Sequence, residues 1–264
     1  MTKAIVCGAL GRMGKSILRL SLEYSDFQVV AGVEHPDCLR STDLGEASGI
    51  EELKGFPITS RLEEVIPFCD VVIEFSGNPT ASLSHARLST ILGKPIVIGT
   101  TGFSQQEVEE LKACSQNAPV LLSPNMSLGV NLLFRLTEIA GKVLREKGFD
   151  VEVLEVHHRY KKDAPSGTAL KLEEILKDVM NLSKSVHGRD GISERGKDEL
   201  GVMALRGGDV VGEHTVYFFG FGERLEITHR ATSRDIFARG AIEAARWIKN
   251  KPPGWYSMFD VLGL

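Results

Sequence analysis

Polar and basic side chains are concentrated in residues 156–170, which read Val-His-His-Arg-Tyr-Lys-Lys-Asp-Ala-Pro-Ser-Gly-Thr-Ala-Leu. The basic groups stand beside Ser166, Gly167 and Thr168, which are typical of a helix start and offer hydroxyls and backbone N–H groups to an anion. The natural occupant is a carboxylate. His157, at the end of a predicted strand, could supply a proton near neutral pH. The alternative is a solvated basic strand end followed by a capped helix.

A glycine-rich segment near the N-terminus, Gly8-Ala-Leu-Gly-Arg-Met-Gly14, lies between a predicted strand and a predicted helix. Such glycines permit a tight turn and let backbone N–H groups approach a pyrophosphate at the helix N-terminus. Glu34 lies 20 residues after Gly14, where an acid could accept hydrogen bonds from a ribose. Together these features predict a dinucleotide site, with Arg12 as a cation at the phosphates. The alternative is a packing turn with a surface glutamate.

Two further loops follow predicted strands, Phe75-Ser-Gly-Asn-Pro79 and Gly99-Thr-Thr-Gly102. Ligands of open α/β sheets bind at the carboxyl ends of the strands, so both loops are expected to face the nicotinamide end of a cofactor. Each is also an ordinary turn when taken alone. A hydride carrier combined with an anion site that holds proton donors predicts the reduction of an acidic substrate.

The elements that position these residues fall into two groups. The first third of the chain alternates short β-branched runs with helical patterns, which predicts βαβ units and an open, doubly wound parallel sheet of the Rossmann type. The expected strands are 4–8, 28–33, 70–75, 95–99 and 119–122, and the expected helices include 79–92 and 104–116.

The pattern of predicted helices and strands changes after Ser123, where a second domain of the α+β class with a mixed or antiparallel sheet is expected. Its predicted elements are a helix over 128–146, strands over 150–156, 201–205, 209–219 and 224–230 in a meander, and a mobile loop over 183–197. A helix over 235–248 is expected to return to the first domain. We therefore assign 1–125 with 235–264 to dinucleotide binding, and 126–234 to substrate binding and oligomerisation.

Composition excludes several classes of protein. With 264 residues, 42% hydrophobic and 25% charged, the chain matches an ordinary folded protein rather than a disordered or disulfide-stapled one. The formal charge of −4 disfavours nucleic acid and anionic membranes as partners. Its four scattered cysteines have no histidine at ligand spacing, so no metal site is expected and a reducing cytoplasm fits best. No apolar run is long enough for a signal peptide or a membrane span.

The motifs together resemble the 4-hydroxy-tetrahydrodipicolinate (dihydrodipicolinate) reductases of bacterial lysine and diaminopimelate synthesis. The resemblance spans nearly the whole chain and rests most on His157-His-Arg-Tyr-Lys161 followed by Asp163-Ala-Pro-Ser-Gly-Thr168. It implies a Rossmann-like domain completed by the C-terminal helix, and a central domain whose sheet mediates a homotetramer. It also implies reduction of a small dicarboxylate by NADH or NADPH.

The resemblance also implies roles for individual residues. His157 and Lys161 correspond to the catalytic positions, and the substrate contacts correspond to His158, Ser166, Gly167 and Thr168. The implied cofactor contacts are Gly8, Ala9, Leu10, Gly11, Arg12, Met13, Glu34, His35, Phe75, Gly99, Thr100, Thr101, Ser123, Pro124, Asn125 and Met126. Some family members have Arg directly after the acidic ribose residue, where this chain has His35, so the choice between NADH and NADPH stays open. Whether His157 or Lys161 delivers the proton also stays open.

Two other functions fit part of the pattern. One is a different two-domain NAD(P)-dependent reductase, such as one that acts on an amino-acid semialdehyde. The other is a dinucleotide-sensing protein without turnover, since a glycine loop alone indicates binding and not chemistry. The second anion site with its proton donors argues against a sensor.

Overall fold

The structure, a computed structural model, describes residues 1–264 and divides into two compact units. Unit 1 consists of Met1–Leu128 and Asp235–Leu264, and unit 2 consists of Gly129–Arg234. None of the helices is both long and apolar enough to cross a membrane.

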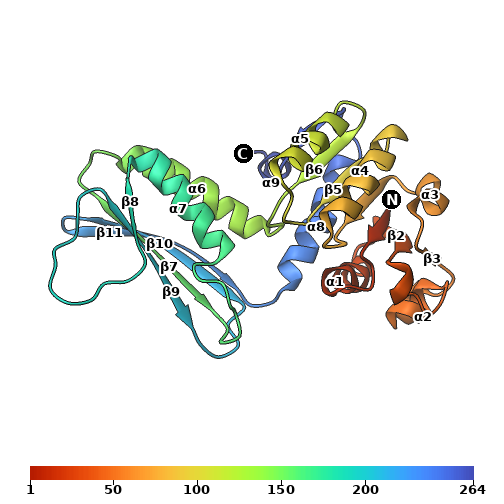
Figure 1. Cartoon of the computed structure of the whole chain (residues 1–264), viewed down its shortest axis with the longest axis horizontal. Coiled ribbons are helices and arrows are strands. Elements are labelled where there is room, and N and C mark those ends of the chain that lie inside the picture. The colour runs from red at the N-terminus through yellow and green to blue at the C-terminus, as the bar shows by residue number, and fades with distance from the viewer. The chain divides into compact units, whose positions relative to one another are not determined.

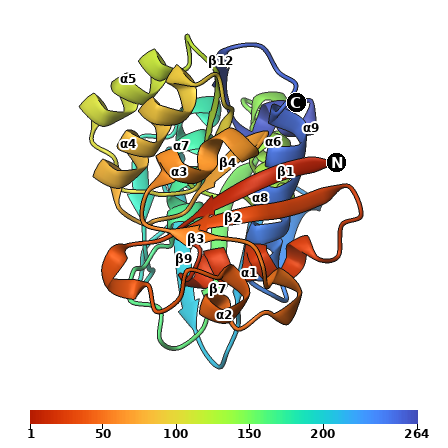
Figure 2. The ribbon, with the colours of Figure 1, turned by 90° about the vertical axis from the view of Figure 1, so that its right-hand side faces the viewer.

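Unit 1 is built on a seven-stranded sheet in which all paired strands are parallel (Figures 1 and 2). The order β12-β6-β5-β4-β1-β2-β3 places β1 between β4 and β2, so the chain changes direction across the sheet at β1. Ligands bind at such a switch point in doubly wound sheets. The strands are β1 (Thr2–Cys7), β2 (Phe27–Val33), β3 (Ile58–Thr59), β4 (Val71–Glu74), β5 (Ile96–Ile98), β6 (Pro119–Leu122) and β12 (Gly254–Tyr256).

Helices cover both faces of this sheet (Figure 2), which confirms the predicted doubly wound class. On one face, α1 and α8 form a core with alternate residues of the strands, and α3, α4 and α5 do so on the other face. The helices of unit 1 are α1 (Arg12–Ser21), α2 (Leu44–Ser48), α3 (Leu62–Val65), α4 (Pro79–Ile91), α5 (Gln105–Cys114), α8 (Asp235–Ile248) and α9 (Met258–Leu262), with 3₁₀ turns at Pro36–Cys38, Glu51–Leu53 and Ile66–Phe68.

Helix α8 belongs to unit 1 although it follows unit 2 in the sequence. Its buried face is rich in alanine, and a side chain on Gly240 would overlap the carbonyl oxygen of Met126. Small residues on this face therefore allow close packing of the helix on the sheet.

Unit 2 contains a mixed sheet of five strands in the order β11-β10-β7-β9-β8. Helix α7 packs on β7 and β9, and α6 lies on the same face beside α7 (Figure 1). The opposite face carries no helix and exposes apolar side chains, among them Leu205 and Phe219. The elements are α6 (Leu128–Leu144), β7 (Asp150–His157), α7 (Gly167–Met180), β8 (Lys184–Val186), β9 (Glu199–Arg206), β10 (Gly212–Gly220) and β11 (Glu223–Ala231).

Two details of the predicted second domain are wrong. The last three long strands do not form a simple meander, because β7 lies between β9 and β10 and pairs in parallel with β9. The segment 183–197 is not wholly a loop, since it contains β8, which pairs in parallel with β9. Only the β10–β11 hairpin follows the predicted local pairing.

Candidate active site

The glycine loop forms a tight strand-to-helix turn in unit 1. Gly8 has a positive φ of 73°, and a side chain there would overlap the carbonyl oxygen of Phe75. A side chain on Gly14 would overlap the carbonyl oxygen of Gly8, whereas the backbone N–H of Gly11 donates to that oxygen over 3.1 Å. Only glycine fits at these two positions, and the turn leaves the first N–H groups of α1 open to an anion.

Glu34 connects the end of β2 to the glycine loop. Its Oε2 accepts a hydrogen bond from the backbone N–H of Leu10 over 2.8 Å, and its Oε1 accepts one from the N–H of His35 over 2.9 Å. Each carboxylate oxygen can accept a second bond, so Glu34 is still able to receive ribose hydroxyls. Arg12, at the start of α1, and His35, next to Glu34 in the chain, are both exposed, with 67% of the His35 side chain accessible.

The later loops of unit 1 support one another. The ring of Phe75 occupies the space that a side chain on Gly99 would need, and the backbone N–H of Gly77 donates to Oγ1 of Thr100 over 3.1 Å. After β6, Oγ of Ser123 donates to the carbonyl of Asn125 over 2.7 Å. The sheet therefore brings the carboxyl ends of β1, β2, β4, β5 and β6 to one edge, where all of the predicted cofactor residues lie.

Some of those predicted residues could contact a cofactor only through their backbone. Ala9 and Met126 are buried, and Met13 packs against the core of unit 1. The predicted residues that are exposed are Gly11, Arg12, His35, Thr101 and Pro124.

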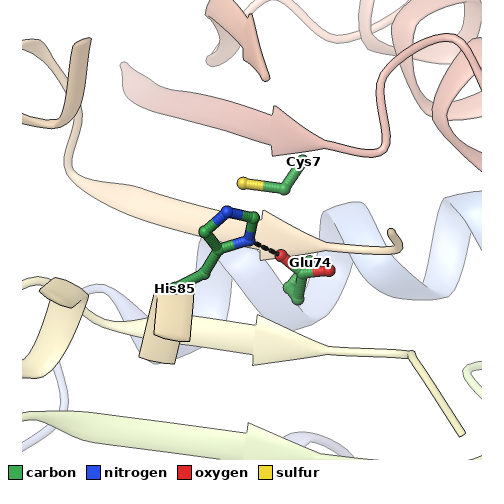
Figure 3. Close-up of side chains that lie close together, drawn as sticks. All are labelled: Cys7, Glu74 and His85. Atoms are coloured by element: carbon green, nitrogen blue, oxygen red, sulfur yellow. Dashed lines mark hydrogen bonds and ion pairs between the residues drawn. The ribbon is translucent and has the colours of Figure 1, made fainter. Parts of the chain in front are cut away.

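A buried polar cluster lies directly beneath these loops (Figure 3). Candidate ligand atoms of Cys7, Glu74 and His85 lie within 4.8 Å of one another, although the spacing of the cysteines indicated no histidine partner. The Glu74 carboxylate is already occupied, because it is bonded to Nδ1 of His85, to the Ser76 N–H over 2.7 Å and to Oγ of Ser82 over 3.0 Å. We interpret the cluster as a hydrogen-bond network that holds the β4 loop.

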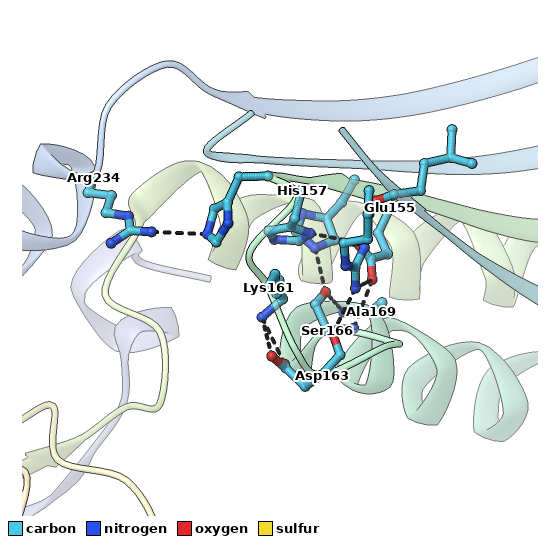
Figure 4. A network of polar contacts seen from close by, with 11 residues as sticks. Glu155, His157, Lys161, Asp163, Ser166, Ala169 and Arg234 are labelled. Carbon is cyan, nitrogen blue, oxygen red and sulfur yellow. Dashed lines mark hydrogen bonds and ion pairs between the residues drawn. The ribbon is translucent and has the colours of Figure 1, made fainter. Parts of the chain in front are cut away.

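The proton donors predicted from sequence lie in unit 2, where His157 ends β7 (Figure 4). Its Nδ1 contacts Oε2 of Glu155 at 2.5 Å, and the Glu155 side chain has no exposed surface. Arg206 donates two hydrogen bonds to Glu155, each over 2.8 Å, and the backbone N–H of Ser166 donates a third over 3.0 Å. Although burial raises the pKa of Glu155, these donors together hold it below its usual range. Glu155 is therefore a buried carboxylate anion that fixes the His157 ring.

The other ring nitrogen of His157, Nε2, lies beside Gly212. A side chain on Gly212 would come within 2.9 Å of Nε2, so glycine at this position makes room for the His157 ring, whose side chain is 10% exposed. No hydrogen bond joins Nε2 to the chain. The His157 ring also lies edge-on to His214, with ring centres 5.1 Å apart. His214 contacts Oγ of Ser166 over 3.0 Å, and burial lowers its pKa to about 3, so it stays neutral.

The remaining predicted residues surround the start of α7. Nζ of Lys161 donates to both carboxylate oxygens of Asp163, over 2.9 and 2.8 Å. Nε2 of His158 contacts the guanidinium of Arg234 over 3.1 Å (Figure 4). Ser166 caps α7 by accepting from the Ala169 N–H over 3.3 Å, so its hydroxyl has a structural role. Gly167 is exposed, with nothing within 4 Å of where a side chain would begin.

Sequence reasoning missed Glu155, Arg206 and Arg234. A signal existed for Glu155, because it precedes His157 by two residues on a strand and therefore points to the same face. Arg206 and Arg234 have no such local signal, since their partners are 51 and 76 residues away in the chain.

The Arg206–Glu155 pair yields a stability prediction. Arg206→Met should lower the free energy of unfolding by about 3 kcal/mol or more, because it leaves a fully buried carboxylate without its cation. Arg230→Met is the matched control, since Arg230 bonds the half-exposed Glu213 at the surface over 3.1 Å and should cost less than about 1 kcal/mol. Urea unfolding measures both, and equal losses for the two variants would contradict the assigned role of Arg206.

Two family models together match nearly the whole chain. Residues 2–126 match the N-terminal model of dihydrodipicolinate reductase, and residues 129–262 match its C-terminal model. The chain belongs to the dihydrodipicolinate reductase family. The match confirms the resemblance drawn from the sequence motifs.

Two relatives of the dihydrodipicolinate reductase family show how close the similarity is. A 4-hydroxy-tetrahydrodipicolinate reductase of Aquifex aeolicus (strain VF5) is 68% identical over 262 residues, covering 99% of each chain. One of Syntrophus aciditrophicus (strain SB) is 47% identical, covering 100% of this chain and 99% of that protein.

The solved structures agree with the family fold. The dipicolinate-bound dihydrodipicolinate reductase of Paenisporosarcina sp. TG-14 superposes with a TM-score of 0.80 at 22% identity, covering 98% of each chain. An amine dehydrogenase of Mycobacterium smegmatis has a TM-score of 0.59 at 13% identity, covering 97% of this chain and 95% of that one. At these identities both likenesses concern the fold alone.

Proposed function

We propose that this chain is an NAD(P)H-dependent 4-hydroxy-tetrahydrodipicolinate reductase of lysine and diaminopimelate biosynthesis. The reaction forms tetrahydrodipicolinate from the hydroxylated precursor by way of dihydrodipicolinate. The observation that carries the proposal is the fixed imidazole of His157, in which Nδ1 is bonded to the buried carboxylate of Glu155 and Nε2 has no hydrogen-bond partner within the chain. Such an arrangement suits a proton donor and has no evident use in a binding protein.

The loops of unit 1 fit a reduced dinucleotide. Gly8 and Gly14 leave no room for side chains, the start of α1 suits the pyrophosphate, and Glu34 suits the adenosine ribose. The reduced nicotinamide, when bound, supplies a hydride for conjugate addition to the unsaturated imine. We assign this role to unit 1, and substrate binding to unit 2.

In unit 2 we assign separate tasks to the two predicted catalytic residues. Addition of a hydride leaves an enamine anion, which needs a proton on the carbon beside the imine, and Nε2 of His157 is the group that we assign to deliver it. Lys161 is assigned to one substrate carboxylate, together with the N–H groups at Gly167 and Thr168. Nζ of Lys161 is bonded to Asp163, which the substrate carboxylate would replace.

An assay with separate substrates tests the proposed function. The product of dihydrodipicolinate synthase should be reduced at the expense of NADH or NADPH, and an amino-acid semialdehyde should not be. Reduction of the semialdehyde alone would indicate another reductase, and cofactor binding without oxidation in either mixture would indicate a sensor.

Cofactor choice gives a further prediction. Because Glu34 would repel the 2′-phosphate of NADPH, we expect NADH to be at least as good as NADPH at pH 7.5. His35→Arg should shift the ratio of kcat/KM values toward NADPH by about 1 kcal/mol or more, because it adds a charged hydrogen-bond donor. His187→Arg adds the same group at an exposed position of unit 2 and should leave the ratio unchanged. A wild-type preference for NADPH above about tenfold would contradict this account.

We also propose that the chain works as a homotetramer in the cytoplasm. The helix-free face of the unit 2 sheet supports self-association, because it presents Leu205, Phe219 and the Tyr217 ring stacked on Phe219 with centres 5.6 Å apart. The four free thiols are compatible with a reducing compartment. Sedimentation equilibrium should give four chains per particle, and a monomer at micromolar concentration would exclude the tetramer.

A further inference from the structure

The charges around His157 create a difficulty for a proton donor. Its Nδ1 faces the anionic carboxylate of Glu155, so in the neutral ring the proton stays on Nδ1. Nε2 then carries a lone pair and no proton. Nε2, which lies beside Gly212, is therefore ready to accept a proton, and cannot donate one until it has done so.

The groups packed around the ring favour this neutral state in the free protein. Arg206 at the end of β9 balances the charge of Glu155, Lys161 adds a second cation that is paired with Asp163, and His214 on β10 is neutral. Burial lowers the pKa of His157, the Glu155 anion opposes this shift, and the two cations add to it. Near pH 7.5 the ring is then largely uncharged, since even an unperturbed imidazole is mostly neutral there.

A bound dicarboxylate would reverse this balance. Of its two negative charges, one would replace Asp163 at Lys161, and the other would add to the negative charge around His157 and so attract a proton to Nε2. We propose that binding of the dicarboxylate substrate is coupled to the uptake of one proton at Nε2 of His157, with Glu155 as the positioning residue for the resulting imidazolium. This inference rests on the proposed function, because it takes the substrate to be a dianion held at Lys161 and α7.

Glu155 is suited to that role by its burial and its partners. Arg206 and the Ser166 N–H hold both carboxylate oxygens, so Glu155 cannot turn away when the ring becomes charged. An imidazolium that donates from Nδ1 to a fixed anion keeps Nε2–H pointed at the ligand. The same contact that orients the neutral ring thus stabilises the charged one.

The sign of the pH effect follows from the coupling. Protonation accompanies binding, so the dissociation constant should rise with pH above the pKa that His157 has in the free protein. Uptake of one proton corresponds to a rise of about tenfold per pH unit, and the rise should level off above the higher pKa of the complex.

Titration calorimetry tests the coupling, with pyridine-2,6-dicarboxylate as the probe and the full chain saturated with NADH. At pH 8 the observed heat, measured in buffers of different ionisation enthalpy, should show uptake of between about half a proton and one proton per chain. Between pH 7.5 and 8.5 the dissociation constant should rise by about threefold to tenfold. The wild-type protein alone therefore decides whether binding takes up a proton, and the absence of uptake there would overturn the inference whether or not the variants fold.

Variants identify the group that takes up the proton. His157→Gln should reduce the uptake to nearly zero, and Glu155→Gln should reduce it to less than half of the wild-type value. His187→Gln, which removes an exposed histidine of the same unit, should leave it unchanged. Binding of the probe with no proton uptake, or unaltered uptake in His157→Gln, would overturn the inference. If the probe produces no heat and no thermal stabilisation, it is the proposed substrate site that fails.

Discussion

Replacement of His157 by glutamine is expected to lower kcat by about 10²-fold or more, while the KM for NADH stays near the wild-type value. A fall in kcat of this size is typical of the loss of a general acid. The KM for NADH should not change, because His157 lies in unit 2 whereas the dinucleotide loops lie in unit 1. Steady-state kinetics with each substrate varied in turn gives both parameters.

His187→Gln is the matched control for this variant. It removes an exposed imidazole of unit 2 and should leave kcat unchanged. A wild-type kcat in the His157 variant would remove His157 from the mechanism. An increase confined to the KM for NADH would instead place it in cofactor binding.

Replacement of Lys161 by alanine is expected to lower kcat/KM for the dicarboxylate by about 10²-fold. Lys161 supplies a charge-assisted hydrogen bond, and bonds to a charged group contribute up to about 3 kcal/mol. Loss of the Lys161 ammonium should also weaken the inhibition by pyridine-2,6-dicarboxylate, which competes with the substrate. Inhibition constants for that dianion, measured against the substrate, check the second expectation.

The adjacent lysine provides a control with the same change of charge. Lys162 is exposed, so Lys162→Ala should change kcat/KM by less than about threefold. If kcat/KM fell equally in both variants, the effect would be a diffuse electrostatic one rather than that of a specific carboxylate site. Added salt would screen such a diffuse effect.

The parts of the molecule that could be predicted from sequence depend on local geometry. The glycine loop, Glu34 and the helix start at Ser166 each depend on a strand, a turn and a helix that follow one another in the chain. A parallel sheet brings the carboxyl ends of its strands to one edge, so the cofactor residues could be grouped before their contacts were known.

The parts that could not be predicted depend on pairings between distant segments. The insertion of β7 between β9 and β10 decides that Arg206 meets Glu155, and neither the hydrophobic pattern nor the turns between strands specify this order. The cluster of Cys7, Glu74 and His85 likewise joins β1, β4 and α4. The strands β3, β8 and β12, which the sequence pattern does not predict, have two or three residues each, and they lack the continuous apolar run that marks the equally short β5.

The proposed reaction is the transfer of a hydride from a reduced nicotinamide to a cyclic dicarboxylate. Its most direct test uses NADH carrying deuterium at the transferable position, mixed with the product of dihydrodipicolinate synthase and the purified chain. Mass spectrometry of the product should show tetrahydrodipicolinate with one deuterium for each NADH oxidised. Oxidation of NADH without deuterium in the product, or an unchanged substrate with the cofactor still reduced, would contradict this proposal.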